Sequence, residues 1–216
     1  MKIALLGGTG DIGEGLALRW ASNHEIIIGS RKEEKAKDAV ARYEKILENF
    51  GISCNMSGHE NAEAAQEAEV VVLSIPYKHI VATVKQIRFS DQIVITPAVP
   101  MKKVKNCMIY CPPREGSCAL LVQKALPRSA KLVAAYQSIA AEKLADVSKS
   151  AEGDVIICSD DDHAKKVVMQ LTADIKNLRP LDGGPLAASA MVEALVPLLI
   201  NVGLKNKVRH PTIRIL

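Results

Sequence analysis

The first hundred residues alternate short apolar runs with longer segments of helical spacing. The apolar runs occupy residues 3–6, 25–28, 52–56, 70–75 and 93–95. Segments rich in helix-forming residues lie between them, at residues 12–21, 32–49, 61–68 and 78–87. Strand-like runs that are closed by Gly or Pro and separated by helices are typical of βαβ units. The pattern therefore predicts an α/β protein with a parallel sheet covered by helices on both faces.

The pattern is less regular after residue 100. It predicts strands at residues 108–110, 132–134 and 155–158, and helices at residues 117–126 and 163–178. A long and almost entirely apolar helix is predicted at residues 187–204, and Pro197 inside it should kink it. A helix that is apolar on most faces needs partners on most sides. We therefore expect this helix to belong to a domain core or to a homodimer interface.

A glycine-rich motif follows the first predicted strand and opens the first predicted helix. Its residues are Gly8, Thr9, Gly10, Asp11, Ile12 and Gly13, which fit the Gly-x-Gly-x-x-Gly pattern. In such a motif the first glycine allows a tight turn, the second lets the backbone approach a pyrophosphate, and the third lets the helix pack closely. The helix N-terminus offers free N–H groups to the phosphates. The motif predicts dinucleotide binding, with an ordinary glycine-rich turn as the alternative.

The end of the second predicted strand indicates which dinucleotide binds. An NAD-binding fold usually has an acidic residue there, which holds the ribose 2′-hydroxyl. This chain has Ser30 and Arg31 instead, with Lys35 one helical turn further on. A guanidinium can bind a 2′-phosphate through its planar fork of donors, whereas a carboxylate would repel it. The sequence therefore favours NADP over NAD, although the same residues also suit an exposed basic helix start.

Two further strand ends should border the ligand, because ligands of such folds bind at the carboxyl ends of the strands. Ile75 and Pro76 end the most hydrophobic run, and His79 follows at the start of a helix. Ala98 and Val99 lie between two prolines after the next run. The alternatives are that His79 is an ordinary surface histidine and that the two prolines only end the strand and begin a loop. Further along, Gly183 and Gly184 form either a plain turn or a close approach to a flat ring.

Composition and charge exclude several classes of protein. The chain has 216 residues, a formal net charge of +4, 48% hydrophobic residues and 3% aromatic residues. These values are typical of a globular protein rather than a disordered or disulfide-stapled one. Aromatic stacking platforms are scarce and the basic residues are interspersed with acidic ones, so we expect no nucleic-acid partner. No apolar run approaches the roughly 18 residues of a membrane span, and we expect no membrane partner.

The cysteines and the acidic run at residues 160–162 suggest no metal site. The five cysteines lack a paired Cys-x-x-Cys spacing, and the N-terminus is too poor in apolar residues for a secretory signal. We therefore expect a cytoplasmic protein with reduced thiols. One carboxylate of the acidic run should cap the helix that begins near His163. No residue set suggests a catalytic triad.

Taken together, the motifs resemble those of the archaeal NADP-dependent oxidoreductases that use the deazaflavin coenzyme F420. The resemblance runs nearly from end to end of the chain. It rests on the segments ALLGGTGDIGEGLALRW, IIIGSRKEEKA, LSIPYKH, ITPAVP, CSDDDHAKKVVMQL and LRPLDGGPL, in this order. It implies a Rossmann-type, doubly wound parallel sheet over residues 1–140, which binds NADP. It also implies a small C-terminal domain over residues 141–216, which completes the cleft for the deazaflavin.

The resemblance also implies roles for individual residues. Thr9, Gly10, Asp11 and Ile12 would hold the pyrophosphate, and Ser30, Arg31 and Lys35 the 2′-phosphate. The adenine and nicotinamide would be bordered by Ile75, His79, Ala98 and Val99, with Pro76 alongside. Ser138, Ile139 and Ala140 would lie near the deazaflavin ring, in a segment where the family carries His, Thr and Pro and this chain has Gln137, Ser138 and Ala140. The C-terminal residues Asn206, Lys207 and Arg209 depart from the family pattern, and Lys207 and Arg209 are candidates to bind the anionic tail of the coenzyme because of their charge alone.

The expected reaction is a reversible hydride transfer between reduced F420 and NADP. Such a transfer needs two rings held at reacting distance and no catalytic acid or base, because the cofactors carry the chemistry. Two alternatives remain open on the sequence. One is another small NADP-dependent reductase, acting on imines, carbonyls or metal ions. The other is a non-catalytic protein that senses NADP.

Overall fold

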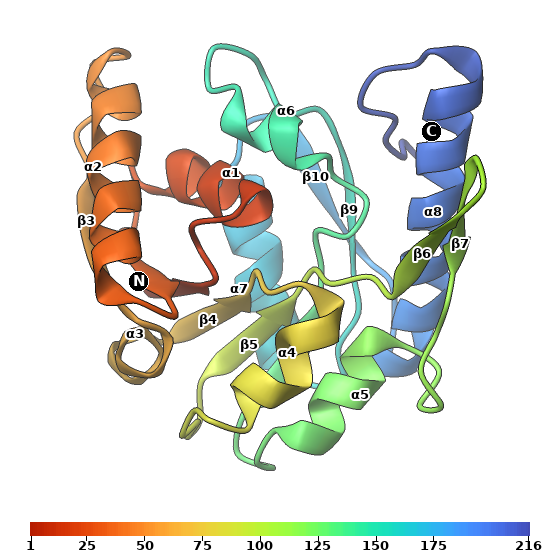
Figure 1. The fold of residues 1–216 in the computed structure, drawn as a ribbon, viewed down its shortest axis with the longest axis horizontal. Helices are drawn as coiled ribbons and strands as arrows, with labels where there is room; N and C mark the ends of the chain where they lie inside the picture. The colour runs from red at the N-terminus through yellow and green to blue at the C-terminus, as the bar shows by residue number, and fades with distance from the viewer.

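The computed structural model describes residues 1–216, and its centre is a sheet of six parallel strands (Figure 1). The strand order is β3-β2-β1-β4-β5-β8, and every neighbouring pair is parallel. This is the doubly wound order of a dinucleotide-binding fold, and it confirms the expected fold class. The strands are β1 (Lys2–Leu6), β2 (Glu25–Ser30), β3 (Asn55–Glu60), β4 (Val70–Leu73), β5 (Ile93–Thr96) and β8 (Lys131–Ala134).

Helices cover both faces of this sheet, and the side chains of each strand divide between the two layers. Along β1, Ile3 and Leu5 pack into one hydrophobic cluster, whereas Ala4 and Leu6 pack into the other. This division follows from the period of two in a strand. The first cluster includes side chains of α1 (Asp11–Trp20), α2 (Glu33–Glu48), α6 (Ala141–Ala145) and α7 (Asp162–Ala173). The second includes α3 (Asn61–Glu67), α4 (Tyr77–Val84) and α5 (Cys118–Ala125).

A second, two-stranded parallel sheet continues the first. It contains β9 (Gly153–Ile157) and β10 (Leu178–Asp182), which α7 connects. Ala134 and Cys158 exchange two backbone hydrogen bonds of 2.9 and 3.0 Å, which join the end of β8 to the end of β9. Asp161 caps α7 by accepting a 2.8 Å bond from the backbone N–H of Ala164, as the sequence predicted.

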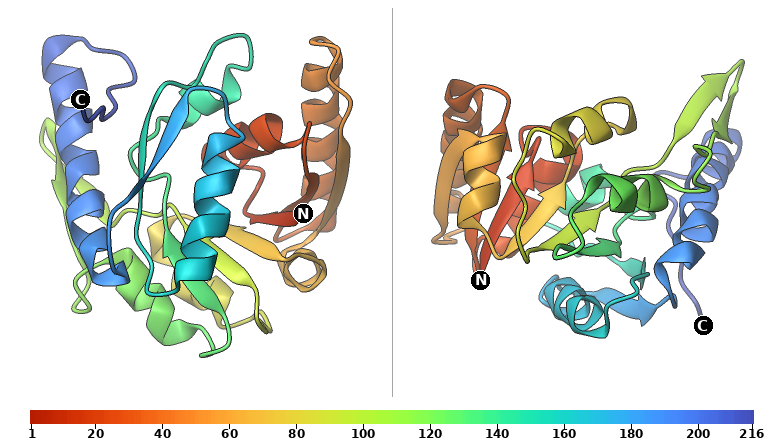
Figure 2. Two further views of the ribbon diagram at one scale, coloured as in Figure 1. Left: turned by 180° about the vertical axis from the view of Figure 1, so that it is seen from behind. Right: turned by 90° about the horizontal axis from the view of Figure 1, so that it is seen from below.

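The remaining elements form a hairpin beside a long helix. The hairpin consists of β6 (Met101–Val104) and β7 (Cys107–Tyr110), and the helix is α8 (Ser189–Asn206), preceded by a short 3₁₀ turn, η1 (Leu186–Ala188). Figure 2 shows the hairpin projecting from the body of the molecule next to α8. The side-chain amide of Asn201 bonds both the N–H and the C=O of Met108, at 2.7 and 2.8 Å, and fixes the two elements together.

A buried carboxylate docks α8 onto α5. Glu193 accepts bonds from the backbone N–H groups of Cys118 and Ala119, at 2.7 and 3.1 Å, and from the hydroxyl of Tyr110 at 3.2 Å. These N–H groups belong to the first turn of α5, where they have no partner within the helix. Burial raises the pKa of Glu193 to about 7. The opposite side of α8 stays exposed, through Met191, Leu198 and Val202.

By length and composition, the helical segment Leu186–Asn206 is long and apolar enough to cross a membrane. In its most apolar stretch of 18 residues, 33% is buried within the protein. The expectation that no apolar run approaches that length is therefore wrong for this segment. Core helices of soluble proteins meet the same criterion. The buried ionisable Glu193 and its three partners show that one face of the helix is occupied by protein.

Candidate functional site: a nucleotide cleft

A cleft of about 1310 Å³ lies at the carboxyl ends of the parallel strands. Glycine-loop residues, strand ends and the first turns of helices form its walls. Thirteen of the sixteen site residues expected from the sequence line it: Thr9, Gly10, Asp11, Ile12, Ser30, Arg31, Lys35, Ile75, Pro76, His79, Ala98, Val99 and Ile139. A single concave surface thus brings together residues that are far apart in the sequence, and its volume suits ligands larger than a drug-sized molecule.

The glycine loop between β1 and α1 is shaped by close backbone contacts. Gly7 has a φ of +70°, which is the left-handed region that glycine adopts at low cost. A Cβ on Gly8 would lie 2.5 Å from the carbonyl oxygen of Leu5, and a Cβ on Gly13 would lie 2.5 Å from the Cα of Gly8. At Gly10 the nearest atom would be 3.5 Å away. The loop therefore needs glycine for its own packing at Gly8 and Gly13, and Gly10 faces open space in the cleft.

Two side chains that the sequence reasoning missed hold this loop. The hydroxyl of Tyr43 donates a 2.9 Å bond to the carbonyl oxygen of Gly8, and burial raises the pKa of Tyr43 to about 12. The side-chain Oδ1 of Asn61 accepts a 3.1 Å bond from the N–H of Gly7. Neither residue belongs to the glycine motif, because each reaches the loop from a later element of the chain.

The end of the cleft beside β2 has a surplus of positive charge. Arg31, Lys32 and Lys35 line the cleft beside the buried Ser30, and none of the three cations forms an ion pair in the structure. By contrast, the nearby Lys37 is paired with Glu33 at 2.7 Å. Unpaired cations that face a cavity attract an anion, and a nucleotide phosphate fits this donor set. These residues therefore fit the extra phosphate of NADP.

The opposite wall combines apolar and polar groups. Ile75, Ala98, Val99 and Ile139 supply apolar surface, and His79 lies at the start of α4. The cleft also includes residues outside the expected set of site residues, among them Lys32, Asn61, Ser74, Lys78, Thr83, Gln86, Met101, Gln137 and Val196. The Oγ of Ser74 and the Oε1 of Gln137 are buried without a hydrogen-bond partner. Such atoms are costly unless a ligand or water pairs with them, so this wall can accommodate polar edges of a ligand.

Three expected site residues do not line the cleft. Gly8 directs its N–H to Leu5 and Gly29 and its carbonyl to Tyr43. Ser138 is buried, and its hydroxyl donates a 3.4 Å bond to the carbonyl oxygen of Asp154. Ala140 is the N-cap residue of α6. Each is a neighbour of a lining residue, and its own groups are used within the protein.

The glycines at residues 183 and 184 and the basic C-terminal residues also lie outside the lining. A Cβ on Gly183 would meet Ile156 at 2.5 Å and the sulfur of Cys158 at 2.7 Å. The glycine therefore allows β10 to turn closely over β9, and the cleft does not use it. Lys207 ends α8 in a left-handed conformation, and Arg209 follows it in the exposed tail.

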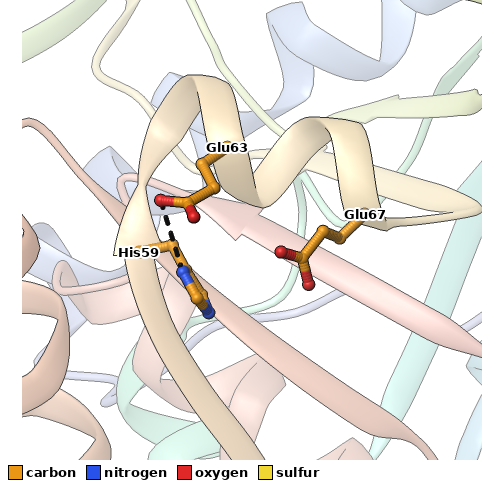
Figure 3. Close-up of side chains that lie close together, drawn as sticks. All are labelled: His59, Glu63 and Glu67. Atoms are coloured by element: carbon orange, nitrogen blue, oxygen red, sulfur yellow. Dashed lines mark ion pairs between the residues drawn. The ribbon is translucent and has the colours of Figure 1, made fainter.

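A separate cluster of potential metal ligands lies elsewhere on the molecule. Ligand atoms of His59, Glu63 and Glu67 lie within 4.8 Å of one another (Figure 3). His59 lies near the end of β3, and the two glutamates belong to α3. Nδ1 of His59 is 3.4 Å from Glu63, and both glutamates are exposed. None of the three residues lines the cleft, and an exposed cluster with an internal ion pair is common without any metal.

Comparison with known proteins identifies the family. A family model described as "NADP oxidoreductase coenzyme F420-dependent" matches residues 2–100. The chain is 43% identical to the F420-dependent NADP reductase of Methanocaldococcus jannaschii over 220 residues, which cover 100% of this chain and 98% of that protein. It is 36% identical to the enzyme of the same name from Methanothermobacter marburgensis over 221 residues, which cover 100% of this chain and 98% of the relative.

A solved structure shows the same architecture. It is that of a putative F420-dependent NADP reductase from an Arthrobacter species, with a TM-score of 0.78 and 24% sequence identity, and it covers 100% of this chain and 99% of that one. This likeness supports the fold, whereas the sequence identities to the archaeal enzymes establish the relationship. The chain therefore belongs to the F420-dependent NADP reductase family.

Proposed function

We propose that this protein transfers a hydride reversibly between reduced coenzyme F420 and NADP. The observation that carries the proposal is the cleft itself, in which a glycine loop at a helix N-terminus meets three unpaired cations. The family relationship supplies the second substrate. The cleft volume of about 1310 Å³ suits two extended coenzymes better than one small substrate.

The lining residues divide into groups by the part of NADP that each group suits. The N–H groups of Thr9, Asp11 and Ile12 are available to the pyrophosphate at the start of α1, whereas Gly10 donates its own N–H to the carbonyl oxygen of Gly7 at 3.1 Å and lets the ligand approach the backbone closely. Ser30, Arg31 and Lys35 hold the 2′-phosphate. Ile75, Pro76, His79, Ala98 and Val99 border the bases, and Ile139 borders the deazaflavin ring. The two coenzymes supply the redox chemistry, and the protein aligns their rings and excludes water.

Absorbance spectroscopy tests this function directly. Reduced F420 mixed with NADP and the protein should give oxidised F420 and NADPH in equal amounts, because one hydride leaves the first and enters the second. Binding of NADP without any transfer would instead indicate a sensor protein. Turnover of an imine or carbonyl with NADPH, and none with F420, would indicate a general reductase.

We further propose that the protein is a homodimer that works in the cytoplasm. The exposed apolar residues Met191, Leu198 and Val202 recur on one side of α8, and Ile109 of the adjoining hairpin is also exposed. An apolar patch of this kind marks an interaction surface. All five cysteines are free thiols, which fits a reducing compartment. Sedimentation at micromolar concentration should give the dimer mass, and a monomer mass would contradict the proposal.

A further inference from the structure

Asn61 occupies a corner of the cleft where the glycine loop and the end of β2 meet. It is the first residue of α3, directly after β3, and it lines the cleft. Its Oδ1 accepts the 3.1 Å bond from the N–H of Gly7. The same atom would lie 2.8 Å from a Cβ on Gly29, the residue before Ser30. One side-chain oxygen is thus held between the carboxyl ends of β1 and β2.

The nitrogen of the same amide remains free. Nδ2 of Asn61 donates to no group in the protein, although a side-chain amide carries two donor hydrogens. In the pairing of β2 with β3, Ser30 lies opposite Glu60, so Asn61 stands level with Arg31 at the edge of the sheet. The free donor therefore belongs to the same end of the cleft as Ser30, Arg31 and Lys35.

We propose that Asn61 is a positioning and specificity residue for NADP. Its Oδ1 fixes the glycine loop, and its Nδ2 donates to the 2′-phosphorylated ribose. Folds that bind NAD usually place a carboxylate near the ribose 2′-hydroxyl, and that carboxylate accepts a hydrogen bond and repels a phosphate. Here a neutral amide keeps the acceptor for the loop and turns a donor to the ligand. This inference rests on the proposed binding of NADP.

The substitution Asn61→Asp separates the two halves of the amide. It keeps the shape and the oxygen that accepts from Gly7, and it replaces the donor with a negative charge. Calorimetry on the full chain should show the dissociation constant for NADP rising by about tenfold or more, because like charges at this range repel strongly. The constant for NAD should change by less than about twofold, since NAD has no 2′-phosphate.

Two further variants make the result specific. Asn61→Ala removes the loop contact and the donor without adding charge, so it should weaken both nucleotides and lower the preference for NADP less than Asn61→Asp does. Asn55→Asp makes the same chemical change at the exposed start of β3, outside the cleft lining, and should leave both dissociation constants unchanged.

The role of Asn61 would be overturned if Asn61→Asp lost the same factor of affinity for NADP and for NAD. It would also be overturned if the Asp and Ala variants preferred NADP over NAD by the same ratio. A merely structural role predicts those equal losses, so the ratio between the nucleotides separates the two explanations. Wild-type protein that fails to bind NADP at all would overturn the proposed function as well. Wild-type protein that binds NADP, with a preference that Asn61→Asp leaves intact, would overturn only this inference.

Discussion

Arg31 is the side chain whose chemistry most directly distinguishes NADP from NAD. It is exposed at the end of β2, lines the cleft and has no carboxylate partner. We expect Arg31→Ala to raise the KM for NADP by about 10- to 100-fold, because a charge-assisted bond to phosphate is lost. The KM for NAD should stay nearly constant. Steady-state kinetics with both nucleotides tests this, with Arg88→Ala, an exposed arginine outside the cleft, as the control.

Glu193 makes the stability of the fold depend on pH. Its ordinary pKa of 4.5 is raised to about 7 in the folded protein, so the folded state binds the proton more tightly than the unfolded state. The stabilising contribution of the protonated form is complete below pH 4.5 and is lost as the pH rises through 7. The free energy of unfolding should therefore fall by roughly 2 to 3 kcal/mol over this interval.

Denaturant unfolding at several pH values measures this effect. The variant Glu193→Gln cannot ionise, so its unfolding free energy should lack that part of the pH dependence. Subtracting the two curves removes contributions from other titrating groups, which both proteins share. Parallel curves for the wild type and the variant would show that Glu193 does not titrate in this range.

For single residues, the sequence predicts which residue types bind the ligand better than it predicts which side chains support them. The glycine motif and Arg31 are local signals, and both lie in the cleft lining or against it. Tyr43 and Asn61 support the glycine loop from positions 35 and 54 residues later in the chain than the groups they bond, and nothing in their local sequence marks them. Gly8 suits its position because of a close approach to Leu5, whereas the left-handed backbone falls on Gly7. A motif specifies residue types, and packing decides which atoms face the ligand.

Among the elements, α6 depends on a side chain from α1. Arg19 donates to the carbonyl oxygens of Lys143, Leu144, Asp146 and Lys149, at 2.7 to 2.9 Å. These bonds satisfy groups at and beyond the C-terminus of a helix of only five residues. We expect Arg19→Met, which keeps the apolar stem, to lower the unfolding free energy by about 2 to 4 kcal/mol.

Hydrogen exchange locates this effect. Amides of residues 141–149 should exchange faster in Arg19→Met than in the wild type, and those of β1 should change least. Arg19→Lys retains the charge and a donor but loses the planar fork, so it should fall between the two. An unfolding free energy equal to that of the wild type would show that solvent replaces the guanidinium without cost.

Elements were predictable where a hydrophobic period repeats over enough residues. With the exception of β3, the strands of the central sheet lie close to their predicted positions, as do the helices α1, α2, α5 and α8. The third strand was expected at residues 52–56, but β3 spans Asn55–Glu60, because this edge strand is only half-buried and lacks a strong apolar run. β6, β10 and α6 were not predicted. β6 is fully exposed, β10 contains Pro180, and α6 is too short to show a period.

For the whole molecule, the two predicted regions share one core. The first hydrophobic cluster joins β1, α1 and α2 to residues of β9 and α7, and the bridge between Ala134 and Cys158 links their sheets. We expect one cooperative unfolding transition, observed at the same denaturant concentration by circular dichroism and by fluorescence of Trp20. The proposed boundary at residue 140 predicts two transitions if the parts fold independently.

Binding of NADP extends the same test. At a ligand concentration of about 100 times the dissociation constant, the unfolding free energy should rise by about 2.7 kcal/mol. With a shared core, hydrogen exchange should slow in β9 and α7 as well as in the nucleotide cleft. Protection confined to residues 1–140 would show that the C-terminal region opens independently.

The bond pair between Asn201 and Met108 has a consequence for the behaviour of the protein in concentrated solution. An unpaired strand edge is a template on which another chain can add a strand, and proteins usually block such edges. The side-chain amide of Asn201 bonds both the backbone N–H and the backbone C=O of Met108, so that another strand cannot pair with the hairpin at that residue. The substitution Asn201→Leu would leave the backbone N–H and C=O of Met108 unpaired at the edge of the hairpin. Light scattering should then detect aggregates of the variant at protein concentrations at which the wild type remains soluble.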